Sequence, residues 1–262
     1  MKKLIINADD FGLTEGINNG IIDCYKKGVI KDISLLADSS AYEHAVGLAK
    51  KNNIKNIGAH ILLSEETDSS RKYYRFPWRH FLGAVSDKDI YSNVKSQISK
   101  IKNSEFDITH LNSHQHIHMV PRILKVFVRL AKEFNIKFIR FPFEAKILNF
   151  LDCKNTLSVF ALRSMCALSK GMLIKNGIKY NDYFYGHFYS GNLNREKLSE
   201  VLSNIKEGIT ELTCHPGYLT DEIRLKYTWH RNCESELMAL SDPRFLEEVN
   251  RRNIEIISYA QA

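Results

Sequence analysis

The chain has 262 residues, 44% of them hydrophobic and 26% charged, a length and composition that suit a globular protein such as a single α/β barrel. The formal net charge is +7, but the lysines are spread along the chain and do not cluster with aromatic residues, which argues against a nucleic-acid-binding surface. The apolar run after Met1 is too short for a signal peptide, and no uninterrupted apolar run could cross a bilayer, so we expect a cytoplasmic protein without a transmembrane helix.

The first part of the chain alternates short apolar runs with amphipathic segments, a pattern that is typical of βα units. Thr14 is expected to cap the first helix and Gly28 to end it. The segment 64–86 has little periodicity and is predicted as a loop. The predicted strands are 2–7, 29–37 and 56–63, and the predicted helices are 14–28, 40–52 and 87–103.

The same alternation continues to the end of the chain, with Pro121 at the first turn of a helix, where its missing N–H costs nothing. The irregularly apolar segment 146–180 is predicted as one or two helices. The predicted strands are 107–114, 137–142, 183–188, 208–217 and 254–260, and the predicted helices are 121–134, 195–205, 231–240 and 242–252.

Repeated βα units indicate an α/β protein with a mainly parallel sheet. Seven or eight units in this length favour a (β/α) barrel, either TIM-type or an irregular seven-stranded barrel, with a doubly wound open sheet as the alternative. We expect a single domain over 1–262 with a helical insertion around 146–180.

Polar side chains end five of the predicted strands, at the edge where catalytic groups of such barrels lie. They are the pair Asp9 and Asp10, then His60, His114, Arg140 and His215. Any one of them could be an ordinary loop residue, but together they complement one another chemically.

Asp10, His60 and His114 form a set of two imidazoles and one carboxylate, which suits one divalent metal ion with open positions. Because strand residues alternate, Asp9 should point away from Asp10. His116 and His118 could support a ligand or contact a substrate. The remaining histidines are interpreted as structural: His44, His80, His110, His187 and His230.

His215 precedes Pro216 and Gly217 and could act as a general acid, or could simply be a turn residue. Arg140 could orient the Asp9 carboxylate through paired hydrogen bonds, or lie on the surface. The aromatic residues of 73–81 could stack on the rings of a substrate or pack the loop onto the barrel: Tyr73, Tyr74, Phe76, Trp78 and Phe81.

The basic and apolar residues of 146–179 favour an insertion that covers the barrel or forms a homodimer contact. Contact with a membrane surface is the alternative, and it is not expected.

Five segments resemble, in order, the motifs of the YdjC-like carbohydrate deacetylases of the ChbG and HpnK types. They are "INADDFGLTEGINNGI", "GAHILL", "HLNSHQHIHMVP", "RFP" and "ELTCHPGY". The resemblance runs from residue 5 to the C-terminus and is weakest over 64–106 and 143–180. It implies a barrel-like fold of the polysaccharide-deacetylase kind and hydrolysis of the acetyl group from an N-acetylated sugar.

Carried onto this sequence, the resemblance implies Asp10, His60 and His114 as metal ligands, Asp9 as the base and His215 as the acid. The two histidines favour Zn²⁺, whereas the family points to Mg²⁺. Asn112 stands where the family commonly has Asp, which implies lower metal affinity or activity. A non-catalytic sugar-binding protein and another metal-dependent TIM-barrel enzyme are the alternative functions.

Overall fold

The computed structural model describes residues 1–63, 85–145 and 153–262. Its centre is a parallel sheet in which β1 is the longest strand and is buried over its last eight residues. The strands are β1 (Lys2–Phe11), β2 (Asp32–Leu35), β3 (Asn56–Ile61), β4 (Asp107–Ser113), β5 (Phe138–Ile139), β6 (Tyr183–Tyr185), β7 (Gly208–Cys214) and β8 (Ile254–Ile256).

The strands follow the order β5-β4-β3-β2-β1-β7-β6, and β8 pairs with the start of β1. The sheet is curled, because isolated parallel bridges from Phe138 to Lys179 and from Glu144 to Phe184 link its two outer edges. This is the irregular, incompletely closed seven-stranded alternative of the predicted barrel. All strand pairs are parallel, so their carboxyl ends meet on one side, where the six predicted site residues lie.

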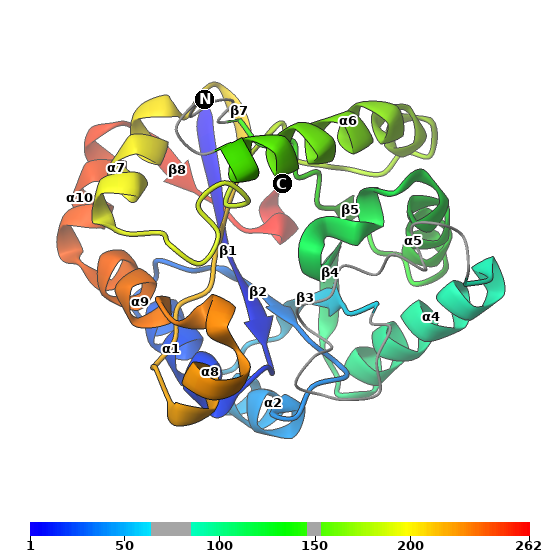
Figure 1. Ribbon diagram of the computed structural model, residues 1–262, viewed down its shortest axis with the longest axis horizontal. Helices are drawn as coiled ribbons and strands as arrows, with labels where there is room; N and C mark the ends of the chain where they lie inside the picture. Colours follow the sequence, from blue (N-terminus) through cyan, green and yellow to red (C-terminus); the bar gives the residue numbers. More distant parts are fainter. Residues whose placement is uncertain (64–84, 146–152) are drawn as a thin grey trace.

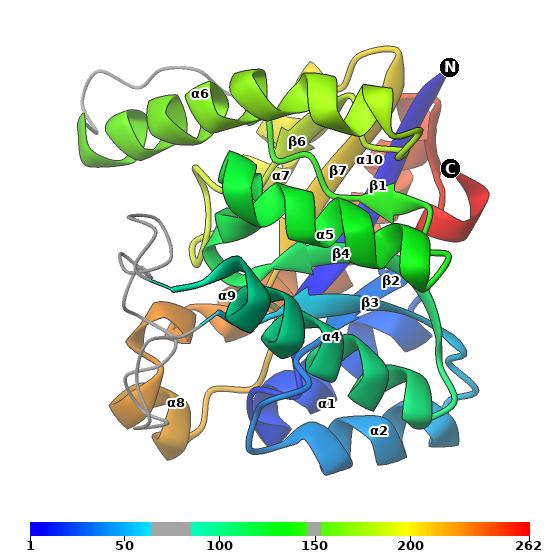
Figure 2. The ribbon, with the colours of Figure 1, turned by 90° about the vertical axis from the view of Figure 1, so that its right-hand side faces the viewer.

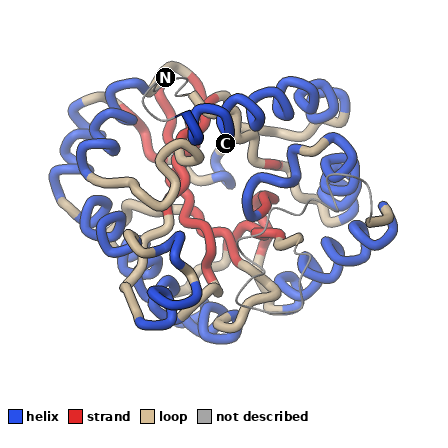
Figure 3. The backbone as a smooth tube through the Cα atoms, in the orientation of Figure 1, coloured by secondary structure: helices blue, strands red, loops and turns tan. Residues whose placement is uncertain are grey.

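Helices surround the strands on the outside (Figures 1 and 3). The α-helices are α1 (Glu15–Lys26), α2 (Tyr42–Lys51), α4 (Asp87–Asn103), α5 (Pro121–Glu133), α6 (Cys153–Lys175), α7 (Arg195–Asn204), α8 (Asp221–Lys226), α9 (Cys233–Ser241) and α10 (Pro243–Arg251). The described residues also contain three short 3₁₀ helices, η1 (His114–Met119), η2 (Thr228–His230) and η3 (Tyr259–Gln261).

Local signals place several of these boundaries. The Thr14 hydroxyl accepts a hydrogen bond from the Ile17 N–H, as expected of an N-cap, and Pro121 occupies the first turn of α5. Gly28 follows α1 with φ 74°, a conformation that glycine adopts without strain.

Other boundaries differ from the sequence expectation. The strand predicted over 137–142 is only Phe138–Ile139, and the one predicted over 254–260 ends at Ile256. The described part of 146–180 contains one long helix, α6, which ends at Lys175, and α8 was not predicted at all. The bounds of the short elements β5, β8 and α8 depend on contacts between residues distant in the sequence, and hydrophobic periodicity within one segment does not predict such contacts.

Candidate active site

The two adjacent carboxylates lie just before the last residue of β1, Phe11, and the chain turns sharply there. Asp10 has φ 64°, in the left-handed region that residues other than glycine rarely occupy. The turn is closed by hydrogen bonds from the Leu13 N–H to the Asp10 carbonyl (3.0 Å) and from the Gly12 N–H to Asn18 Oδ1 (2.6 Å). As a result, Asp9 and Asp10 meet different neighbours.

Asp10, His60 and His114 converge, although they come from β1, β3 and the start of η1. Their candidate ligand atoms lie within 4.8 Å of one another. Asp10 Oδ1 is 3.2 Å from His60 Nε2 and 3.4 Å from His114 Nδ1. The structure thus brings together the three residues that the sequence singled out.

The surroundings of Asp10 fit a cation. The residue is 1% exposed, and within the described part of the chain Oδ1 has no hydrogen-bond partner, whereas Oδ2 lies 2.8 Å from His230 Nε2. Burial raises the pKa of Asp10, but the neighbouring imidazoles, His114 first, outweigh it and hold this pKa well below its ordinary value. A buried ionised oxygen facing two ring nitrogens is a suitable donor set for a divalent metal.

Asn112 on β4 holds the other side of the His60 ring. In one orientation of its amide, Oδ1 lies 2.7 Å from His60 Nδ1 and accepts its proton, which leaves Nε2 with a lone pair. In the reversed orientation Nδ2 faces His60, while Oδ1 accepts from Ser34 and Arg140. Only the first orientation prepares His60 Nε2 to bind a metal.

Asp9 is held by Arg140. Arg140 Nη1 donates to Asp9 Oδ2 at 2.6 Å and Nη2 to Oδ1 at 2.9 Å, while Nε donates to Glu211 Oε1 at 2.7 Å. Burial raises the pKa of Asp9, but the charge and hydrogen bonds of Arg140 outweigh it and hold this pKa below its ordinary value. Asp9 is therefore ionised at neutral pH.

Arg140 is fully buried, so the surface-arginine alternative was wrong. It does not belong to the lining of the neighbouring pocket, which includes Asp9. We therefore interpret Arg140 as a positioning residue for Asp9 and not as a group that touches the substrate.

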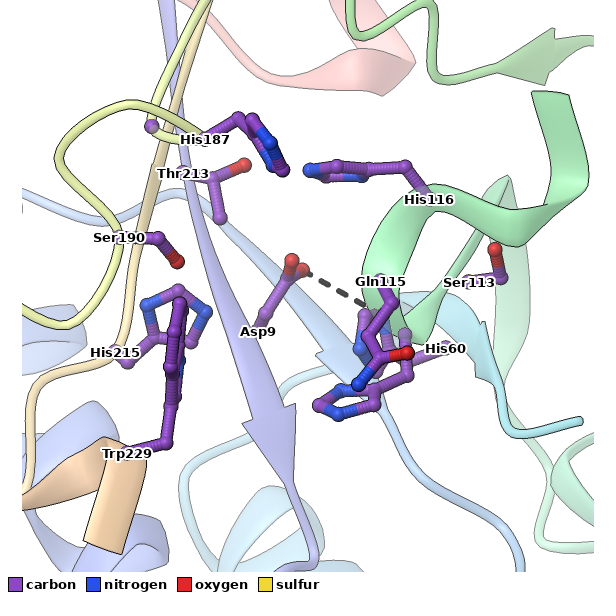
Figure 4. A pocket seen from close by; sticks show the side chains of 12 residues that line it. Asp9, His60, Ser113, Gln115, His116, His187, Ser190, Thr213, His215 and Trp229 are labelled. Carbon is purple, nitrogen blue, oxygen red and sulfur yellow. Dashed lines mark ion pairs between the residues drawn. The ribbon is translucent and has the colours of Figure 1, made fainter. Parts of the chain in front are cut away.

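A pocket opens at the carboxyl ends of the strands, with Asp9, His60 and His114 in its lining (Figure 4). In this view Asp9 lies at the centre, with His215 to one side and His60 to the other. Trp229, which is 45% exposed, completes the rim beside His215.

His215 follows β7 and is fixed through its backbone. Its N–H donates to Glu236 Oε2 at 2.6 Å, and its ring Nδ1 lies 3.9 Å from the same oxygen. Burial lowers the pKa of His215 to about 4 and raises that of Glu236 to about 7. The resting His215 is therefore neutral at pH 7.

The two histidines that follow His114 differ from each other. His118 is buried, with Nδ1 2.7 Å from Ser113 Oγ and Nε2 3.0 Å from the Arg140 carbonyl oxygen, so it supports the backbone. His116 lines the pocket and, like Gln115, adopts a left-handed conformation, with φ 55° and 56°. Figure 4 shows its ring facing His187, with the ring centroids 5.5 Å apart.

The sequence model of the family described as YdjC-like protein matches residues 3–251. The chain belongs to the YdjC-like family. A carbohydrate deacetylase of Thermoanaerobacter pseudethanolicus is 28% identical to it over 99% of each chain.

Two solved structures share the fold of this YdjC-like protein. A protein of Enterococcus faecalis V583, provisionally assigned as a cellobiose-phosphate cleavage protein, superposes with a TM-score of 0.78 at 22% identity, covering 99% of this chain and 98% of the other. The peptidoglycan N-acetylglucosamine deacetylase Bc1960 superposes with a TM-score of 0.50 at 12% identity, covering 98% and 85%. At these identities the likeness concerns the fold alone.

Sequence reasoning missed several residues of the YdjC-like site. His230 and His187 were interpreted as structural, yet one binds Asp10 and the other lines the pocket. The sequence could have indicated Glu211, because a charged residue inside a buried strand needs a partner of opposite charge. Glu236 and Trp229 had no local signal, because their roles arise from contacts distant in sequence.

His110 has a structural role in this YdjC-like protein, as the sequence analysis predicted. Its Nε2 lies 2.9 Å from Ser34 Oγ, and its ring stacks on Tyr259 at 3.8 Å. A Cβ on Gly58 would lie 2.2 Å from His110 Nε2, so only glycine fits opposite this ring. Ser34 Oγ also accepts from Asn112 at 2.8 Å, which connects His110 to the residue that orients His60.

The aromatic residues of 73–81 that were considered for sugar stacking lie outside the described residues.

Proposed function

We propose that this YdjC-like protein is a metal-dependent carbohydrate deacetylase that hydrolyses the acetyl group from an N-acetylated sugar. The observation that carries the proposal is the convergence of the buried Oδ1 of Asp10 with ring nitrogens of His60 and His114, beside the pocket that contains Asp9. The names of the relatives support the same activity.

Asp10, His60 and His114 would hold one divalent ion, Zn²⁺ or Mg²⁺. When bound there, the ion would polarise the acetamide carbonyl and lower the pKa of the attacking water. Two imidazoles and one carboxylate favour zinc over magnesium, because magnesium prefers oxygen ligands. His230 would keep Oδ2 of Asp10 engaged and so direct Oδ1 toward the ion.

Asp9 would take the proton of the attacking water. It lines the pocket in ionised form, and the two hydrogen bonds from Arg140 fix the plane of its carboxylate. The same hydrogen bonds make Asp9 a weak base, so positioning contributes more to its role than basicity does.

His215 would deliver a proton to the departing sugar nitrogen, which is otherwise a poor leaving group. Because burial keeps the resting ring neutral, His215 must gain that proton during turnover. The proton that Asp9 removes from water balances the one that the nitrogen receives. Trp229 offers an aromatic face at the rim for stacking on the sugar ring.

The decisive experiment is an acetate-release screen over N-acetylhexosamine oligomers, nucleotide sugars and lipid-linked sugars, with and without a chelator. We expect release from at least one class, loss of release with chelator, and recovery with Zn²⁺ or Mg²⁺. Elemental analysis should find one ion per chain. Tight sugar binding without acetate would instead identify a sugar-binding protein, and two ions per chain would favour another metal-dependent enzyme.

A further inference from the structure

Helix α6 presents an apolar face that the described parts of the protein leave exposed. Of the nine large apolar side chains exposed among the described residues, four lie on this one helix, so the exposure is concentrated there. They are Leu157 (69% exposed), Phe160 (68%), Leu168 (77%) and Ile174 (59%). Apart from Lys170, the exposed positions between them are small: Ser158, Ala161, Ser164, Ala167 and Gly171.

The opposite face of α6 packs on the domain. Val159, Leu162 and Leu173 are buried, and the Ser169 hydroxyl donates to the Met119 carbonyl at 2.9 Å. The segment Thr156–Lys175 is long and apolar enough to cross a membrane, although 28% of it is buried in the protein. With one face fixed to the domain, α6 can lie along a lipid surface but cannot cross a bilayer alone.

The charges of α6 all have one sign. The sequence of the helix contains Lys154, Arg163, Lys170 and Lys175 and no acidic residue. Lys170 and Lys175 are exposed, and neither forms an ion pair within the described ranges. A surface that is apolar at its centre and basic at its flanks complements an anionic lipid layer.

We propose that α6 docks this protein on an anionic lipid surface, lying in the plane of the headgroups. A second copy of the chain fits the face less well. Two facing copies of α6 would place four exposed lysines, Lys170 and Lys175 of each copy, in one small interface. One helix face of about 30 by 10 Å is also well below the roughly 800 Å² per partner of a stable dimer.

The helix also lies next to the pocket. Ser158 Oγ is 3.1 Å from Nε2 of His187, which belongs to the pocket lining. Figure 2 shows α6 along one edge of the molecule, with its first turns projecting beyond the body. A lipid surface under α6 would therefore lie close to the pocket entrance.

Co-sedimentation of the full chain with vesicles tests the proposal without requiring turnover, so its outcome is independent of the deacetylase proposal. We expect binding to vesicles that contain phosphatidylglycerol, weak binding to pure phosphatidylcholine, and weaker binding as salt rises. The double variant Phe160→Ser/Leu168→Ser should bind at least about tenfold more weakly. Lys170→Gln/Lys175→Gln should lose about tenfold, mainly on anionic vesicles.

The matched control is Leu225→Ser/Met238→Ser, which removes two apolar side chains of similar exposure (81% and 67%) from α8 and α9. This control should bind like the original protein, and circular dichroism should show all variants folded. The proposal is overturned if the original protein ignores anionic vesicles, or if the control loses as much binding as the α6 variant. It is also overturned if the chain is a dimer that the α6 substitutions dissociate.

Discussion

Asp9 combines two properties that seldom occur together in one buried carboxylate: it is ionised, and it reaches the pocket. Arg140 makes this combination stable, because its charge compensates for the loss of water around Asp9. Glu211 binds the same guanidinium from the other side and keeps it in place.

Asp9→Asn should lower kcat by about 10²–10⁴-fold, because an amide cannot accept the proton of the attacking water. Metal content should not change, since Asp9 is not one of the three converging ligands. Steady-state acetate release and elemental analysis on the same preparation check both points. Asp10→Ala should instead lose the metal, and near-normal turnover in Asp9→Asn would show that another group acts as the base.

Asn112→Asp should tighten metal binding, by up to about tenfold. Aspartate can only accept from His60 Nδ1, whereas the present amide can also turn its Nδ2 toward that ring. Competition with a chelating dye measures the affinity. Unchanged or weaker affinity would mean that the amide of Asn112 already has the favourable orientation.

At the scale of elements, the predictions were most successful where the residues of a single segment determine its secondary structure. The α/β class, the order of the longer strands and helices, and the cap at Thr14 all follow from local periodicity and capping chemistry. Local periodicity and capping do not predict the two-residue strand β5 or the short helices η1 and η2. The bounds of these elements depend on contacts with residues distant in the sequence.

Gly58→Ala should destabilise the protein by about 1–3 kcal/mol, because the new Cβ would overlap the buried His110 ring across β3 and β4. The matched control is Gly47→Ala on α2, where the described residues beyond its own turn of helix leave open space around the new Cβ. This control should stabilise the helix by about 0.5–1 kcal/mol. Urea unfolding compares the two, and equal effects would argue against the tight packing at His110.

At the scale of the whole molecule, the site is assembled from residues that are far apart in the chain. Asp10 and His230 are 220 residues apart, and Asp9 and Arg140 are 131 apart. The motifs at strand ends predicted Asp10, His60 and His114 because parallel strands bring their carboxyl ends together. His230 lies on a short helix outside the sheet, so this rule could not place it.

Asp32, the first residue of β2, contacts the C-terminal helix η3 and should make stability depend on pH. It is buried and accepts the Tyr259 N–H with both oxygens, and burial raises its pKa to about 8. Between pH 3.8, its ordinary pKa, and about 8, the folded protein keeps a proton that the unfolded chain has released. The stability contributed by Asp32 is therefore greatest below pH 3.8 and is lost as pH rises, by at most about 1.4 kcal/mol per pH unit.

Asp32→Asn should remove this dependence. Unfolding free energies measured by urea titration from pH 5 to about 8 should show a shallower slope for Asp32→Asn than for the original protein. Asp38→Asn, at a neighbouring exposed position, is the control and should leave the slope unchanged. Parallel slopes for all three proteins would refute the role of Asp32.

The left-handed backbone at Asp10, Gln115 and His116 has a consequence for engineering. Each conformation costs a non-glycine residue roughly 1 kcal/mol, and glycine would relieve it. A library screened for heat resistance alone would thus enrich glycine at these three positions and discard a proposed metal ligand together with two pocket residues. Thermostabilisation of this protein should hold them constant and introduce glycine instead at left-handed positions outside the pocket, such as Glu105 with φ 70°.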